Sequence, residues 1–160
     1  MADHEIKGLI LEHLEDSERE TALAFAEFLL PRVTCLYRDQ GFWKNKIYFI
    51  AEYQGEGVCY IAIRDPDEPE NRWTVWSDDM DCSATVDRAA AEAAWKHVDH
   101  CGNCGSCGGG RRKMIFGKEL TDVCGCTFRL DNPGEEDLHF LEKMVELRLN
   151  EIDAGKKEME

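Results

Sequence analysis

The chain has 160 residues, of which 43% are hydrophobic and 32% are charged, and its formal net charge is −14. This length and composition predict one ordinary globular domain with a buried core. The strong negative charge argues against a general affinity for nucleic-acid phosphates or for anionic membrane surfaces. We therefore expect neither nucleic acid nor a membrane among its partners.

The N-terminal residues show neither the basic region nor the apolar region of a secretory signal. No stretch approaches the roughly 18 apolar residues that would suggest a membrane span. We therefore expect a cytoplasmic protein, in a compartment where thiols are kept reduced. The eight cysteines then indicate metal ligands, reactive thiols or small buried hydrophobes rather than disulfides.

Helices are expected at the start of the chain. Apolar residues at helical spacing predict a first helix over about 5–15, and residues 1–15 form a helical lead-in. Ser17 to Glu20 matches a capping box, so a second helix should begin there. Pro31 marks the end of that helix, because proline cannot continue the hydrogen-bonded turn.

The middle of the chain is typical of an antiparallel meander. Strands are predicted over 46–53, 57–64 and 72–77, where Ile, Val and aromatic residues are frequent. Gly55 and Gly57 favour a hairpin between the first two strands, because glycine accepts a positive φ without steric cost.

The second half combines helices with two more strands. We predict a helix over about 85–98 and strands over 113–116 and 123–130. Asn132 as a cap and Pro133 at the first helical position predict a last helix that runs to about Asp153. Residues 154–160 are expected to form a frayed tail.

Together these elements predict a single α+β domain over 1–160, in which an antiparallel sheet of about five strands packs against helices. A cysteine- and glycine-rich insertion over 99–126 interrupts this pattern and is predicted to be a metal-binding loop. Five of the eight cysteines lie within it, at positions Cys101, Cys104, Cys107, Cys124 and Cys126.

These five cysteines are the candidate metal ligands. A Cys-x-x-Cys turn points two sulfurs inward, and both Cys101–Cys104 and Cys104–Cys107 have this form with a glycine after the second cysteine. Cys124 and Cys126 would project from the same face of a strand and supply another pair. Four soft ligands in tetrahedral geometry favour structural zinc. His97 and His100 are further candidates, and the spacing does not select four ligands among the seven.

Three alternatives to zinc stay open. The spacing of Cys101, Cys104 and Cys107 also matches an iron–sulfur cluster with a distant fourth ligand, although the usual close fourth cysteine before a proline is absent. A Cys-x-x-Cys pair can serve as a redox centre when its thiol pKa is lowered. The cysteines can also be reduced residues in a glycine-rich loop that binds nothing.

Other candidate features have simpler interpretations. Cys35, Cys59 and Cys82 stand alone and are predicted to be small core residues. Gly108 to Lys113 is the one concentrated positive segment and is expected to be a flexible turn with solvated cations, with a local anion or partner contact as the alternative. Core packing is also the simpler interpretation for a set of aromatics that could instead line an apolar cleft for a small molecule. That set comprises Trp43, Tyr48, Tyr53, Tyr60, Trp73, Trp76 and Trp95.

The chain resembles the frataxin-like-fold superfamily, which includes many small uncharacterised bacterial proteins. The resemblance rests on the helical lead-in, Trp43-Lys44 before a strand, the Gly55–Gly57 hairpin with Tyr60, and the closing helix. It covers about residues 20–77 and 114–152 and implies a compact antiparallel sheet packed against helices. The cysteine-rich insertion departs from the family pattern, so the resemblance implies no functional residues here.

The functional hypothesis is a non-enzymatic binding or interaction domain with a structural zinc site, whose partner is an unknown protein or small molecule. No Ser/His/Asp or Cys/His arrangement and no pair of carboxylates indicates acid–base catalysis. The alternative hypothesis is an iron–sulfur or Cys-x-x-Cys redox protein.

Overall fold

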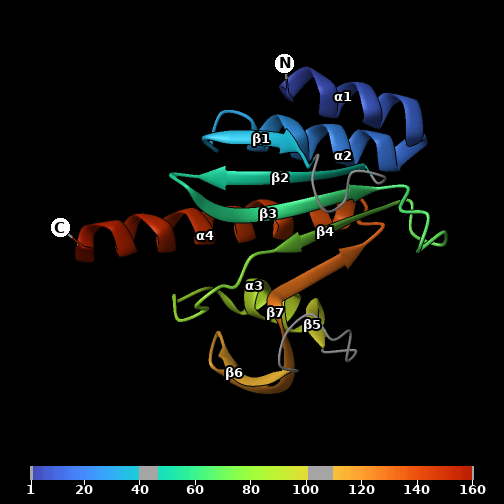
Figure 1. Cartoon of the computed structure of the whole chain (residues 1–160). Coiled ribbons are helices and arrows are strands. Elements are labelled where there is room, and N and C mark those ends of the chain that lie inside the picture. The colour runs from blue at the N-terminus through green and yellow to red at the C-terminus, as the bar shows by residue number, and fades with distance from the viewer. Residues whose placement is uncertain (1, 40–46, 101–109, 160) are drawn as a thin grey trace.

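The computed structural model describes residues 2–39, 47–100 and 110–159. Figure 1 shows how the elements follow one another along the chain. The helices are α1 (Ala2–His13), α2 (Asp16–Leu29), α3 (Arg88–Lys96), the short 3-10 helix η1 (Glu135–Asp137) and α4 (Leu138–Met159). The strands are β1 (Cys35–Arg38), β2 (Ile47–Tyr53), β3 (Glu56–Ile63), β4 (Trp73–Ser77), β5 (Val98–His100), β6 (Arg111–Ile115) and β7 (Lys118–Asp131).

The described residues form a seven-stranded sheet, so the prediction of about five strands was wrong. The strand order is β1-β2-β3-β4-β7-β5, with β6 paired to β7, and every pairing is antiparallel. The two strands that were not predicted are β1 and β5, which contain four and three residues. Alternation over so few residues is too short to distinguish a strand from a loop. Residues 101–109 of the predicted metal-binding loop lie outside the described residues, and the rest of the range 99–126 belongs mainly to β5, β6 and β7.

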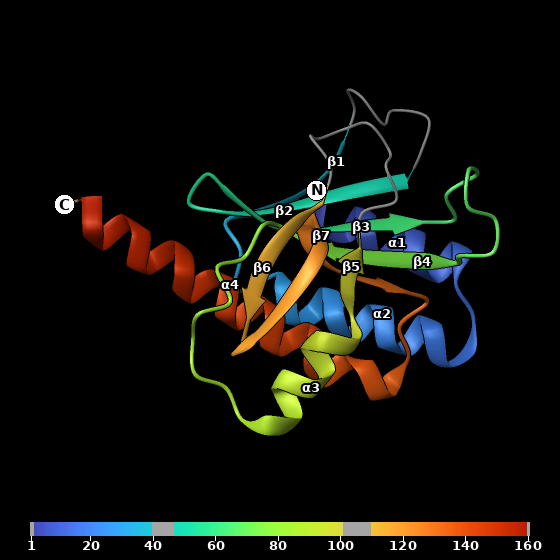
Figure 2. The same cartoon turned by 90° about the horizontal axis from the view of Figure 1, so that it is seen from below.

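The core lies between the sheet and the helices, and α1 contributes Ile6 and Ile10 to it. Figure 2 shows α2, α3 and α4 beneath the sheet. Alternate residues of β3 point into this layer, because successive side chains of a strand face opposite sides. Cys59 and Ile63 are fully buried there, and Ile61 is nearly so. Phe128 of β7 is also buried and meets Phe140 of α4 edge-on, with 5.5 Å between ring centroids.

The β2–β3 turn confirms the predicted hairpin. Gln54 and Gly55 have φ values of 52° and 83°, the pair of positive values that a tight hairpin turn requires. A glycine is needed at position 57 for a different reason. A Cβ there would lie 2.1 Å from a carboxylate oxygen of Asp78, which accepts a hydrogen bond from the hydroxyl of Tyr60.

Several helix ends differ from their predicted positions. Glu15, not Ser17, is the N-cap of α2, and its side chain makes no capping hydrogen bond. The helix α3 is capped by Asp87, whose carboxylate accepts the N–H of Ala90 at 2.7 Å. It ends at Lys96, and the chain passes directly into β5. The last helix continues to Met159, beyond its predicted end at Asp153.

Candidate metal centre

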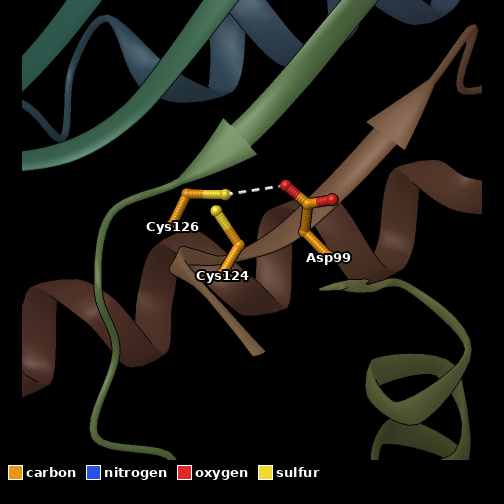
Figure 3. A group of neighbouring side chains, drawn as sticks. All are labelled: Asp99, Cys124 and Cys126. Atoms are coloured by element: carbon orange, nitrogen blue, oxygen red, sulfur yellow. Dashed lines mark hydrogen bonds between the residues drawn. The ribbon is translucent and has the colours of Figure 1, made fainter. Parts of the chain in front are cut away.

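Three side chains that are known metal-ligand types converge where β5 lies beside β7. Asp99 comes from β5, and Cys124 and Cys126 come from β7. One ligand atom from each of them lies within 4.8 Å of the other two, and all three residues are half-buried. Figure 3 shows the two sulfurs and the carboxylate pointing toward one another. Two regions far apart in sequence therefore contribute to one small cluster.

The cysteines lie on an irregular stretch of β7. Val98 pairs with Phe128, and His100 pairs with Val123. A step of two residues along β5 therefore matches a step of five residues along β7, so β7 carries additional residues here. The additional residues include the Cys124-Gly125-Cys126 segment. Thr127, directly after it, has a φ of 67°, which is a rare conformation for a β-branched residue. Strained backbone and bulges of this kind are enriched at functional sites, where they redirect side chains.

Buried hydrogen bonds hold this irregular stretch in place. The hydroxyl of Ser77 donates to the carbonyl oxygen of Cys126 and accepts the N–H of Phe128 at 3.1 Å. The hydroxyl oxygen of Thr127 accepts the N–H of Met80 at 3.2 Å, and the ammonium of Lys113 lies 3.3 Å from it. Ser77 and Thr127 are fully buried, so their hydroxyls compete little with water. The backbone that carries both cysteines is therefore fixed from β4 and β6.

Without a metal, the cluster is a thiol hydrogen-bonded to a carboxylate. The sulfur of Cys126 donates to Oδ2 of Asp99 at 3.1 Å. Burial raises the pKa of the Cys126 thiol, and the hydrogen bond and charge of Asp99 raise it further. The raised pKa favours the protonated thiol. A divalent cation would instead favour the thiolate, because it stabilises a thiolate and a carboxylate together.

The geometry suits a zinc ion. Zinc–sulfur bonds of about 2.3 Å in a tetrahedral site place neighbouring ligand atoms about 3.8 Å apart. The three atoms here are within 4.8 Å of one another, and the sulfur of Cys126 is 3.1 Å from Oδ2 of Asp99, so small side-chain shifts would bring them to bonding positions. Two sulfurs and one carboxylate oxygen provide three of four tetrahedral positions.

The structure brings together two of the five predicted cysteine ligands. Cys124 and Cys126 are adjacent, as the alternation along a strand predicted. The other three, Cys101, Cys104 and Cys107, lie outside the described residues, and their role stays a prediction.

The two candidate histidines lie outside the described cluster. Nε2 of His97 is 3.5 Å from a carboxylate oxygen of Asp137, and its ring stacks on Phe140 at 5.3 Å. Burial lowers the pKa of His97, which favours its neutral form. His100 is exposed, and its Nδ1 lies 3.2 Å from the carbonyl oxygen of Thr121.

Asp99 was missed by the sequence interpretation. The region before Cys101 was predicted to be a helix that ended near residue 98. Asp99 lies just beyond that end, so it was part of no hydrophobic pattern. The one signal in the sequence that pointed to Asp99 as a ligand was its position two residues before Cys101. Only the pairing of β5 with β7 shows that its carboxylate faces Cys126.

The isolated cysteines divide into two groups. Cys59 and Cys82 are buried core residues, as predicted, and burial raises the pKa of each thiol to about 12. Cys35 is exposed on the edge strand β1, so its prediction as a core residue was wrong. Its sulfur lies 3.6 Å from a carboxylate oxygen of Glu52.

The described aromatic residues occupy separate places. Trp73 is buried in the core, Tyr53 donates to Asp153 at 2.9 Å, and Trp95 donates to the carbonyl of Ile115 at 2.7 Å. In a second group, Tyr48 stacks on Tyr60 with 6.2 Å between ring centroids, and its ring is tilted against that of Trp76 at 6.0 Å. The predicted aromatic Trp43 lies outside the described residues. None of the six described aromatic candidates lines the cleft formed by β6, α4 and the segment after β4.

Among the described residues, no helix is long and apolar enough to cross a membrane. Comparisons of the chain with protein-family models, with curated proteins and with solved structures found no match. The resemblance to the frataxin-like-fold superfamily therefore stays a prediction.

Proposed function

We propose that this protein is a cytoplasmic, non-enzymatic binding domain in which a structural zinc ion joins β5 to β7. Asp99, Cys124 and Cys126 supply three ligands, and one of the cysteines at 101, 104 and 107 supplies the fourth. The convergence of three ligand atoms within 4.8 Å carries the proposal. A complete set of four protein ligands leaves no open position for water or a substrate, which is the arrangement of structural zinc sites.

The carboxylate in the cluster favours zinc over an iron–sulfur cluster. Zinc accepts sulfur, nitrogen and carboxylate oxygen ligands, whereas iron–sulfur clusters are held mainly by cysteine thiolates. The group beside Cys126 is the carboxylate of Asp99, a hard oxygen ligand.

The electrostatics at Cys126 favour a metal ligand over a reactive thiol. A reactive cysteine needs a lowered pKa, so that the thiolate is present at neutral pH. Burial and the neighbouring Asp99 act in the opposite direction and raise the pKa of the Cys126 thiol. A buried thiol beside a carboxylate gains little as a nucleophile, but both groups become ligands once a cation is present.

The metal explains how so short a strand as β5 is held at the edge of the sheet. Three residues supply few ladder hydrogen bonds, and β5 has β7 as its partner within the described sheet. A bond from zinc to Asp99 on one strand and to two cysteines on the other would add a link that does not depend on strand length. The domain's partner is an unknown protein or small molecule.

Metal analysis of the purified protein tests this proposal. We expect one zinc per chain and no visible colour in the wild-type protein, because zinc has no partly filled d shell. Cys124→Ser and Asp99→Asn should lose zinc to a chelator at a concentration that leaves the wild-type protein loaded. Cys35→Ser is the matched control, because Cys35 is an exposed thiol outside the cluster. Iron with sulfide would instead support the redox alternative, and zinc retained equally by all variants would reject these ligands.

A further inference from the structure

A charged cleft opens where β6, the segment after β4 and α4 meet. Its volume is about 590 Å³, within the range of small-molecule sites. Its lining residues are Asp79, Met80, Asp81, Arg111, Arg112, Lys113, Arg148 and Glu151. Four are cations and three are acids, in a chain whose net charge is −14. The cleft is thus locally positive on a strongly acidic protein.

Two cations of β6 share one carboxylate. The ammonium of Lys113 lies 2.7 Å from Oδ1 of Asp79, and the guanidinium of Arg111 contacts the same oxygen. Burial raises the pKa of Asp79, but Arg111 and Lys113 outweigh that effect and hold the pKa below its usual value. Asp79 is therefore ionised at neutral pH, and this group of three carries a net positive charge.

The opposite wall of the cleft is fixed by α4. Nε of Arg148 donates to the carbonyl of Gly57 at 2.9 Å, and its Nη1 lies 3.7 Å from Glu151. The carboxylate of Glu151 accepts the N–H groups of Asp81 and Cys82 at 3.0 and 3.3 Å. These contacts hold both walls in place before a ligand arrives, which reduces the ordering that binding requires.

We propose that this cleft binds a small multivalent oxyanion, with Arg111, Lys113 and Arg148 as its contacts. Guanidinium and ammonium groups are the side chains that bind phosphate and carboxylate oxygens with charge-assisted hydrogen bonds. Asp79 contacts both Arg111 and Lys113, and the ligand would displace this carboxylate or join it. The ligand is either a phosphate ester or a polycarboxylate. The zinc proposal can fail without affecting this one, because none of the three contacts belongs to the metal cluster.

The first test removes the competing carboxylate. Binding of inorganic phosphate to the purified full-length chain is measured by calorimetry at constant ionic strength. Asp79→Asn should bind phosphate about tenfold more tightly than the wild type, because a charged hydrogen-bond competitor is lost. Glu92→Gln is the matched control, since Glu92 pairs with Arg88 on α3 and makes the same change in net charge. Equal tightening in both variants would show a general charge effect and overturn the proposal.

The second test removes a contact. Arg111→Gln should weaken phosphate binding about tenfold, whereas Arg88→Gln should leave it unchanged. The side chains of Arg111 and Arg88 are 49% and 79% exposed, so neither change should disturb the core. Parallel titrations with citrate identify the source of the oxyanion: tighter binding of phosphate indicates a phosphate ester, and tighter binding of citrate indicates a polycarboxylate. No saturable binding of either, or equal binding by the wild type and both arginine variants, would overturn the proposal.

Discussion

Replacing Cys124 by serine is expected to lower the free energy of unfolding by several kcal/mol in the presence of zinc, because binding of a structural metal is coupled to folding. Serine is close to cysteine in size but is a poor ligand for zinc. Cys124 is only half-buried, so lost packing alone should have a small effect. The large expected loss therefore comes from the metal link between β5 and β7.

Thermal or chemical unfolding with and without a chelator measures this effect. Chelation should bring the wild-type protein down to the stability of Cys124→Ser, and the variant itself should respond little. Cys35→Ser should unfold like the wild type under both conditions, because Cys35 is exposed on β1. An unchanged melting temperature for Cys124→Ser with zinc present would contradict the metal link.

Phe128→Ala is expected to destabilise the protein by about 3–5 kcal/mol, the usual range for a large aromatic residue removed from a core. The side chain of Phe128 is 1% exposed, meets Phe140 of α4 edge-on and stacks on Phe116 at 6.5 Å. Its backbone N–H donates to Ser77, which also holds Cys126. The loss should therefore loosen the segment that carries both cysteines as well as the core.

Denaturant unfolding of Phe128→Ala checks this prediction, with Tyr37→Ala as the control. Tyr37 is an aromatic residue on the edge strand β1 and is 37% exposed, so its replacement should change stability by about 1 kcal/mol or less. A loss below that of Tyr37→Ala would show that Phe128 does not support the β7–α4 interface.

The elements with a clear periodic pattern were predictable. The β2–β3 hairpin follows from Gly55, which adopts the positive φ that glycine tolerates, whereas the positive φ of Gln54 was not predicted. The helix α4 follows from apolar spacing after Asn132. Asn132 itself does not cap the helix. Its side-chain oxygen accepts the N–H of Trp73 at 3.3 Å and so ties the end of β7 to the start of β4. Local capping rules could not anticipate a partner from another strand.

The site was predictable in its cysteines and not in its carboxylate. Cys124 and Cys126 could be paired from the alternation of one strand, which is local information. Asp99 joins them through the pairing of β5 with β7, a long-range contact. The β7 irregularity at Thr127 depends on partners from β6 and from the segment after β4, and no pattern in the sequence indicates them.

X-ray absorption at the zinc edge of the purified protein tests the central claim most directly, because it measures ligand types and bond lengths at the metal. We expect three sulfurs at about 2.3 Å and one oxygen at about 2.0 Å, as three cysteines and Asp99 would give. Asp99→Asn should alter the oxygen shell, whereas Cys35→Ser should leave the spectrum unchanged. A first shell of oxygen and nitrogen without sulfur would contradict a zinc site at Asp99, Cys124 and Cys126.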